Sequence, residues 1–258
     1  MKCFRAPAWA VILTALAGIR AVANAQGAPL FQGNEIPAIA DAQGAPPALQ
    51  GIPWTAPADA APLWNGKDLT GWVPFFKGGI AAPKDFWSAS DGVLHLVGKP
   101  TGYLRTDRVY GDYHLHAEWR WAGQPAKGTN NSGIFVLQHP PDVVWPYSVQ
   151  VQVKAGSCGD LISQGGLLFP AGDPNPTIKK LGDSEKPSGE WNGYDIYCTN
   201  NSIEVYVNGV RQNSVTNLPT DSGQIALQME GYPIEFRNIW LEQLVMLHPG
   251  PATSPSST

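Results

Sequence analysis

Polar residues alternate along one short segment, 113–121, in a way that could support chemistry. Its sequence, YHLHAEWRW, has His114, His116, Glu118 and Arg120 at every second position, so a β-strand would present all four on one face and its apolar residues on the other. Carboxylate and imidazole groups can transfer protons, and a guanidinium can hold a hydroxyl or a ketone. A solvated outer sheet face would look equally polar. The pattern therefore leaves two interpretations open, a sugar or small-molecule site and a solvated face.

The strands that would position these side chains can be found by the same alternation. It recurs in short blocks separated by turn residues, namely 92–97, 113–121, 133–138, 147–154, 194–199, 202–207, 224–230 and 234–241. Asn208-Gly209 predicts a two-residue type I′ hairpin, and residues 199–202 predict a second tight turn. Eight or more short strands with few helical stretches predict an all-β sandwich or jelly roll.

Several other predicted strands carry amides and charged groups on their non-core side. Gln150 and Gln152 alternate with valines, and Gln228 and Glu230 alternate with apolar residues. If these strands neighbour 113–121 in one sheet, they form a single polar surface that can hydrogen-bond many hydroxyls. The ten tryptophans offer apolar ring faces for stacking against sugars.

Two further segments bear on a site. Residues 156–190 form a long stretch rich in glycine and proline, which is too long for a simple connection and is a candidate binding loop. Asp160 within it could bind a ligand or a metal, or only cap its own turn. Asn131-Ser132-Gly133 predicts a tight turn that could also present an amide to a ligand.

The two ends of the chain predict export. Residues 1–25 carry basic residues, a short apolar segment and an Ala-x-Ala site, which predicts a secretory signal peptide cleaved after Ala25 rather than a membrane span. Residues 26–59 predict an Ala/Gly/Pro-rich flexible arm, 60–246 one domain, and 247–258 a disordered tail. We therefore expect a periplasmic or secreted bacterial protein.

Charge and cysteine content narrow the classes of partner. The full sequence has a net charge of −4. The charged residues in 1–25 are all basic, so cleavage would make the mature chain more negative. Nucleic acid is therefore not expected as a partner. Cys158 and Cys198 would remain after cleavage, and either a bridge between them or two buried free thiols fits their spacing. The serine-hydrolase elbow, the Walker loop and the dinucleotide fingerprint do not occur in the sequence.

Six motifs in order resemble the 3-keto-disaccharide hydrolase-like domain family. They are LWNGKDLTGW (63–72), EWR (118–120), NSGIF (131–135), GEWNGYDI (189–196), VNG (207–209) and ALQMEGYPIEFRNIWL (226–241). The resemblance covers nearly all of residues 60–245. It implies a concanavalin A-like jelly-roll sandwich of two antiparallel sheets, in an exported protein that cleaves glycosides oxidised at the 3-position.

The activity that the resemblance implies has a simple chemical logic. A ketone at C3 acidifies the proton on C2, so a base can remove that proton, the aglycone can leave from C1, and water can add afterwards. Glu118 and Glu230 are the expected acid/base residues, while Arg120, Asn131, Gln150, Gln152, Gln228 and Asp160 are expected to bind substrate. The 3-keto sugar would come from an upstream oxidoreductase.

One departure from the family pattern keeps a second hypothesis open. The resemblance implies Glu where this chain has Gln150. Glutamine cannot take a proton, so the base or metal-ligand role of a carboxylate at that position is lost. The alternative is a non-catalytic carbohydrate-binding jelly-roll module. No cofactor is evident; a divalent cation could bind at His114 and His116, although two exposed histidines on an edge strand fit the same pattern.

Overall fold

The computed structural model describes residues 56–79, 83–123, 130–170 and 177–244. Within these residues the chain forms strands β1 to β16 and one short 3-10 helix, η2 (Pro83–Asp85). The predicted all-β class is confirmed. The predicted signal peptide, the C-terminal tail and the arm up to residue 55 lie outside the described residues, as do residues 80–82, 124–129 and 171–176. Among the described residues, no helix is long and apolar enough to cross a membrane.

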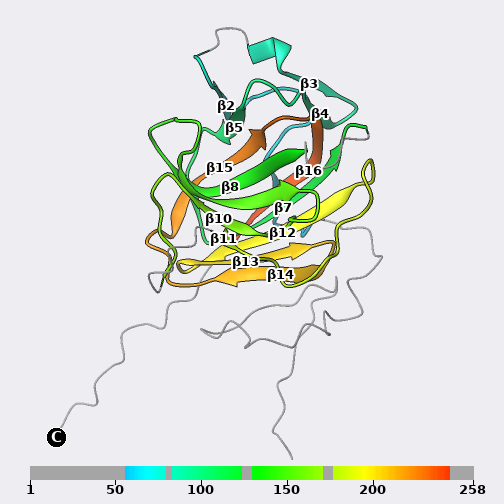
Figure 1. The fold of residues 1–258 in the computed structure, drawn as a ribbon. Helices are drawn as coiled ribbons and strands as arrows, with labels where there is room; N and C mark the ends of the chain where they lie inside the picture. The colour runs from blue at the N-terminus through cyan, green and yellow to red at the C-terminus, as the bar shows by residue number, and fades with distance from the viewer. Residues whose placement is uncertain (1–55, 80–82, 124–129, 171–176, 245–258) are drawn as a thin grey trace, which may run out of the picture. The chain divides into compact units, whose positions relative to one another are not determined.

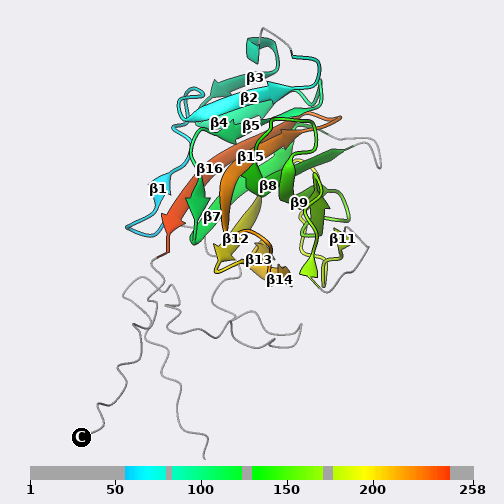
Figure 2. The ribbon, with the colours of Figure 1, turned by 90° about the vertical axis from the view of Figure 1, so that its left-hand side faces the viewer.

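The strands form two antiparallel sheets, seen as two layers in Figures 1 and 2. Sheet I runs β14–β13–β12–β7–β16–β4–β3, with β1 beside β16. Its bounds, in that order, are Val210–Val215, Ser202–Val207, Asn192–Thr199, Tyr113–Trp121, Ile234–Gln243, Val93–Leu96 and Trp87–Ser90, with β1 at Ala61–Pro62.

Sheet II runs β11–β10–β9–β8–β15–β5–β2, with β6 beside β15. Its bounds, in that order, are Thr177–Ile178, Leu161–Gln164, Tyr147–Lys154, Asn131–His139, Ser222–Met229, Gly102–Thr106 and Trp72–Phe76, with β6 at Tyr110–Gly111. The chain therefore passes several times between the two sheets, as in a jelly roll.

The core lies between the sheets because each strand turns its apolar face inward. On β7, Leu115 and Trp119 are fully buried, and on β9, Val149 and Val151 are as well. These residues belong to one hydrophobic cluster that both sheets share. The outer face of sheet I and the outer face of sheet II are consequently on opposite sides of the sandwich.

The two predicted tight turns both connect neighbouring strands of sheet I. Asn200 and Asn201 have φ of 46° and 60°, and Asn208 and Gly209 have φ of 53° and 79°. Two consecutive left-handed residues are what a type I′ hairpin requires. The first turn joins β12 to β13 and the second joins β13 to β14, as predicted.

The expected single polar surface is wrong, because its strands are divided between the sheets. β7 and β16 are neighbours in sheet I, whereas β8, β9 and β15 are in sheet II. Glu118 and Arg120 thus lie on one outer side of the sandwich, and Gln150, Gln228 and Glu230 belong to the other. Alternation shows which side chains share a face, but it does not show which strands are neighbours.

Two local predictions are also corrected. Asn131-Ser132-Gly133 is not a turn but the beginning of β8, where Asn131 pairs with Lys154 and Gly133 pairs with Gln152. Strand pairing overrides the turn preference of these residues. Residues 156–190 are not wholly a loop, because they contain β10 and β11, which extend sheet II.

Cys158 and Cys198, the cysteines among the described residues, are free thiols, and both are buried. Cys198 lies in β12 of sheet I, while the Cys158 Sγ contacts the carbonyl oxygen of Lys154 at 3.3 Å, just after β9 of sheet II. Of the two alternatives that the spacing allowed, the structure therefore has the unbridged one.

Candidate functional site

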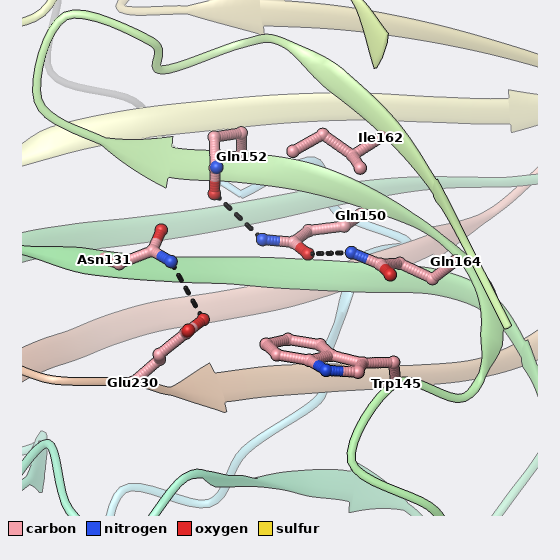
Figure 3. A pocket seen from close by; sticks show the side chains of 7 residues that line it. All are labelled: Asn131, Trp145, Gln150, Gln152, Ile162, Gln164 and Glu230. Atoms are coloured by element: carbon pink, nitrogen blue, oxygen red, sulfur yellow. Dashed lines mark hydrogen bonds between the residues drawn. The ribbon is translucent and has the colours of Figure 1, made fainter. Parts of the chain in front are cut away.

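A small hollow opens on the outer face of sheet II, with a volume of about 170 Å³ (Figure 3). It is lined by side chains of β8, β9, β10, the residue that follows β15, and the loop between β8 and β9: Asn131, Trp145, Gln150, Gln152, Ile162, Gln164 and Glu230. Asn131, Gln150, Gln152 and Glu230 are four of the site residues that the sequence predicted. The lining contains one carboxylate, three glutamine amides and one asparagine amide.

Glu230 is the carboxylate of this hollow, and two amides hold it in place. Its Oε2 accepts hydrogen bonds from Asn131 Nδ2 at 2.9 Å and from Gln228 Nε2 at 2.8 Å. Glu230 follows the end of β15 and forms an isolated β-bridge with Asn131. Burial raises the pKa of Glu230, although the two amide donors and the charge of Lys154 oppose that rise. A carboxylate of this kind is a stronger base than an exposed one.

A directed chain of amides leads to this carboxylate. Gln164 Nε2 donates to Gln150 Oε1 at 2.8 Å. Gln150 Nε2 in turn donates to Gln152 Oε1 at 2.8 Å and to Gln228 Oε1 at 3.1 Å. Because Gln228 turns its oxygen towards Gln150, its NH2 group is turned towards Glu230. The orientation of each amide thus depends on that of its neighbour.

Gly133 provides the space that this chain needs. It lies in β8 between β9 and β15, and a Cβ atom built on it would be 2.7 Å from the Cγ and Nε2 of Gln150. Real Cβ atoms essentially never approach other atoms so closely. The absence of a side chain at this position lets Gln150 reach across β8 to Gln228.

Trp145 forms a wall of the hollow, and an ion pair anchors the loop that carries it. Within the loop between β8 and β9, Asp142 accepts hydrogen bonds from Arg105 Nε at 2.7 Å and Nη2 at 2.9 Å, and from the Tyr103 hydroxyl at 3.0 Å. Tyr103 is fully buried and packs edge-on against Phe135 at 5.7 Å. The bidentate contact with Arg105 lowers the pKa of Asp142, so the anchor stays charged.

The predicted residues Glu118 and Arg120 are not in this hollow. Glu118, on the outer face of sheet I, accepts hydrogen bonds from Arg237 Nε at 2.6 Å and from Asn238 Nδ2 at 3.1 Å. Arg120 donates from Nε to Glu235 Oε2 at 2.5 Å. These ion pairs join β7 to β16 across the sheet, rather than joining Glu118 to Arg120 or Glu235 to Arg237 along one strand. The structure gives them partners on neighbouring strands and places them on the other side of the sandwich from Glu230.

His114 and His116 are buried in a central strand, so the expectation of exposed histidines on an edge strand is wrong. Asp195 Oδ1 lies 2.9 Å from His114 Nε2 and 2.8 Å from His116 Nδ1. The His114 ring also stacks on Tyr197 at 4.3 Å. In the part of the chain that is described, no group of three or more His, Cys, Asp and Glu side chains is arranged to hold a metal ion.

Asp160 is buried, and it stabilises the segment that contains β10 and β11. Its carboxylate accepts hydrogen bonds from Lys179 Nζ and from the backbone N–H of Lys180, each at 2.9 Å. It does not line the hollow. Its partners are about 20 residues further along the chain rather than in its own turn, so these contacts differ from the turn cap that the sequence allowed.

Three lining residues were not predicted. Trp145 lies in a loop, while Ile162 and Gln164 lie in the four-residue strand β10, within the stretch assigned to a loop. The sequence LISQ of β10 has only one full alternation of apolar and polar residues. Its pairing with β9, in which Ile162 faces Gln150 and Gln164 faces Ser148, is what brings these side chains to the site.

The chemistry of the hollow differs from that of a conventional glycosidase. Such an enzyme needs two carboxyl groups on either side of the scissile bond, about 5 to 9.5 Å apart. Among the described residues, the lining contains only one, Glu230, beside amides and two apolar side chains. One base surrounded by hydrogen-bond donors suits the removal of a proton from a carbon next to a ketone better than it suits paired acid and base attack.

Similar solved structures share this fold. A candidate glycosyl hydrolase from Parabacteroides distasonis is 28% identical, with 74% of this chain and 86% of that chain covered and a TM-score of 0.52. A second one from that organism is 19% identical, covering 72% and 94%, with a TM-score of 0.54. The carbohydrate binding module CBM66 from Bacillus subtilis is 9% identical, covering 68% and 98%, with a TM-score of 0.50. The last two likenesses show the fold alone.

Family membership rests on a match to a sequence model of a whole domain. No curated protein matches the chain. The model of the 3-keto-alpha-glucoside-1,2-lyase-like domain, however, matches residues 59–242. This range includes both sheets apart from Gln243, the last residue of β16, together with all seven residues of the hollow and the six motifs on which the resemblance was based. The chain belongs to the 3-keto-alpha-glucoside-1,2-lyase-like domain family.

Proposed function

We propose that this protein cleaves 3-keto-glycosides by elimination across C1 and C2, with Glu230 as the base. The observation that carries the proposal is Glu230, the one carboxylate that the described residues place in the hollow. Burial raises its pKa, and two amides hold its position. The fold and the family membership support a carbohydrate as the ligand. The preference for 3-keto sugars and the catalytic role of Glu230 are parts of the proposal.

The proposed step balances without an external oxidant or reductant. Glu230 removes the proton from C2, and the electron pair of that C–H bond forms the enolate of the C3 ketone. The enolate then re-forms the ketone, a C1–C2 double bond appears, and the bond from C1 to the aglycone oxygen breaks. The leaving oxygen takes a proton from the carboxylic acid of Glu230 or from water. Addition of water to the resulting enone gives the product of net hydrolysis.

The amides have distinct roles in this proposal. The hydrogen bonds described at Glu230 both fall on Oε2, from Asn131 and Gln228, which leaves Oε1 to receive the proton. Gln152 and Gln164 lie at the surface of the hollow, where their remaining amide groups can hydrogen-bond the ketone and hydroxyls. Amide donors directed at the oxygen that becomes negative stabilise an enolate.

A divalent cation is compatible with the oxygen atoms present, and its use is also a proposal. Asn131 Oδ1 is buried and accepts no hydrogen bond from the described residues. Together with the Glu230 carboxylate, it would supply the oxygen ligands that Mg²⁺ or Ca²⁺ prefers. The chemistry such an ion supplies is stabilisation of the enolate charge.

A non-catalytic carbohydrate-binding module is the second candidate, and one observation favours it. Gln150 is at the centre of the amide chain, where the family resemblance implies Glu, and it cannot accept a proton. A shallow surface lined by amides and a tryptophan is also typical of sugar binding without turnover. Multiple turnovers would rule this candidate out.

The deciding experiment measures aglycone release from a small panel of 3-keto-glucosides, with the same glucosides unoxidised as controls. Each substrate is also prepared with deuterium at C2, and each assay is run with Mg²⁺ and with a chelator. The proposal expects turnover of the 3-keto compounds only, slowed by the deuterium because the C2–H bond breaks. Release with no isotope effect and equal rates on unoxidised glucosides would contradict it. Loss of rate with chelator would show that a cation takes part.

We also propose that the protein is exported and works downstream of an oxidoreductase. The signal peptide expected over residues 1–25 supports the first point, and the absence of a dinucleotide fingerprint in the sequence supports the second. An enzyme that oxidises the C3 hydroxyl would supply the substrate. Fractionation of the producing cells, followed by mass measurement of the N-terminus, would test export and cleavage after Ala25.

A further inference from the structure

The hollow has a polar end and an apolar end (Figure 3). Glu230, Asn131 and Gln152 are at one end, and the Trp145 ring and Ile162 are at the other. The strand register agrees with this division. Asn131 forms a β-bridge with Glu230 at the polar end. Ile162 pairs with Gln150, which is two residues further from that end along β9 than Gln152. A ligand that fills the hollow therefore meets hydrogen-bonding groups on one side and apolar surface on the other.

The size of the hollow limits what fits inside it. A volume of about 170 Å³ is well below the 300 Å³ or more of pockets that enclose drug-sized ligands. One sugar ring therefore takes up most of the space, and the group attached to C1 must extend beyond it. With the sugar at the Glu230 end, that group lies against the apolar end.

The apolar end continues onto the surface of the anchored loop. Trp145 is 41% exposed, and Val143 on the same loop is 43% exposed. Both follow closely after the loop's anchor, Asp142, which the Arg105 guanidinium and the Tyr103 hydroxyl hold. The indole surface is thus already in place before a ligand binds, which lowers the entropic cost of binding.

The apolar end offers few hydrogen bonds to a second sugar. Its polar lining residues are Gln150 and Gln164, and their amides already hydrogen-bond each other, with Gln164 Nε2 donating to Gln150 Oε1 at 2.8 Å. A second pyranose placed there could stack its C–H face on the indole, but few lining groups are left to hydrogen-bond its hydroxyls. An aromatic ring would instead stack on the indole with no loss of hydrogen bonds.

We propose, building on the proposed function, that the substrates are 3-keto-glycosides of aromatic alcohols, with the sugar over Glu230 and the aromatic aglycone against Trp145. Trp145 is then the residue that selects the aglycone. Asp142 is a positioning residue, which acts by fixing the loop on which Trp145 lies.

The test compares kcat/KM for phenyl 3-keto-glucoside with kcat/KM for a 3-keto-disaccharide. The wild type is expected to prefer the phenyl substrate. Trp145→Ala should lower kcat/KM for the phenyl substrate about tenfold or more, and that for the disaccharide by less than about twofold. Trp145→Phe should keep most of the preference. Asp142→Asn should lower the preference for the phenyl substrate, as Trp145→Ala does. Val109→Ala, at an exposed residue in the short segment between β5 and β6, is the matched control and should change neither value.

Two results would overturn this inference. Equal losses on both substrates in Trp145→Ala would mean that the indole stacks on the sugar ring itself. A wild-type preference for the disaccharide would mean that the apolar end does not receive the aglycone. Thermal melting of each variant separates these effects from loss of folding.

A binding arm separates failure of this inference from failure of the proposed function. If neither substrate is turned over, the proposed function fails, and calorimetry with unoxidised phenyl and methyl glucosides then decides the inference. Tighter binding of the phenyl compound that Trp145→Ala abolishes would support the aromatic subsite. Equal binding of the two glucosides, or no binding of either, would contradict it.

Discussion

Gln150 reaches across β8 to Gln228, and its Nε2 lies 3.1 Å from the Gln228 Oε1. The contact joins β9 to β15, two strands that are not neighbours, because β8 lies between them. It is possible because Gly133 is the β8 residue beneath it. This one contact fixes the direction of the Gln228 amide and so ensures that a donor, not an acceptor, meets Glu230.

Gly133→Ala should therefore disturb the site more than the fold around it. The added Cβ would be 2.7 Å from Gln150, which must move aside and lose its contact with Gln228. We expect a loss of about 1 to 3 kcal/mol in the free energy of unfolding, typical of overpacking, together with reduced turnover. Chemical denaturation and steady-state kinetics measure the two effects.

Gly193→Ala is the matched control for that substitution. Gly193 is also in the interior of a strand, β12, but its added Cβ would meet only the His116 Cε1, at 3.4 Å, on the outer face of sheet I. Stability and turnover should change much less. Similar losses of activity in both variants would show that the contact across β8 does not matter to the site.

Gln150→Glu tests the role of the glutamine at the position where the family resemblance implies glutamate. The carboxylate would face the side-chain oxygens of Gln152 and Gln228, which now accept hydrogen bonds from Gln150. We expect a loss of about 1 to 3 kcal/mol in the free energy of unfolding at neutral pH. Burial would raise the pKa of the new carboxyl in the folded state, so the loss should shrink as the pH falls through that pKa. Denaturation measured over a range of pH checks this.

The activity of Gln150→Glu separates the two candidate functions. If Glu230 is the base, turnover should fall, because the Gln228 amide loses the partner that orients it. A variant that turns over 3-keto-glucosides while the wild type only binds them would instead identify residue 150 as the missing catalytic position. That outcome would favour the binding-module interpretation of the natural sequence.

Much of the fold and part of the site could be predicted from alternation alone. The blocks at 113–121, 147–154 and 202–207 match β7, β9 and β13 residue for residue. Other strands lack the pattern. β2, for example, has the sequence WVPFF, in which Pro74 is tolerated because β2 is at the edge of sheet II.

The division of polar residues between the two sheets could not be predicted, because it depends on long-range pairing. Glu118 and Glu230 look equivalent in the sequence, because each lies in a segment where polar and apolar residues alternate, and each directly follows an apolar residue. Only the strand order shows that Glu118 faces Arg237 on sheet I while Glu230 lines the hollow on sheet II. Trp145 could not be predicted either, because its position depends on the contact between Asp142 and Arg105.

The two thiols provide a test of the sandwich itself. Cys158 and Cys198 are buried and unbridged, and burial raises the pKa of both, that of Cys198 to about 12. We expect iodoacetamide to modify neither in the native protein and both after denaturation, since the thiolate is the reacting form. A reducing agent should leave the melting temperature unchanged. A drop in melting temperature on reduction would show that the two are bridged in the purified protein.

Glu230→Gln should abolish most turnover while the protein remains folded. The amide can keep an oxygen where Oε2 accepts from Asn131 and Gln228, but it cannot take a proton. Loss of a general base lowers kcat by about 100- to 10,000-fold. Glu118→Gln is the matched control, because Glu118 is bound to Arg237 and Asn238 on the other side of the sandwich. A reversed result, with turnover lost only in Glu118→Gln, would move the site to sheet I.

The same pair of variants gives a test through pH. Burial raises the pKa of Glu230 in the folded state above its unfolded value. The charged carboxylate therefore lowers the free energy of unfolding, and this loss of stability develops as the pH rises through the folded pKa. Glu230→Gln should therefore melt at a higher temperature than the wild type at neutral pH, and this advantage should disappear at acidic pH, where the wild-type carboxyl is protonated. Wild-type kcat/KM should fall over the same acidic range as the base is lost. Melting curves and rate profiles that change over different pH ranges would mean that another group is the base.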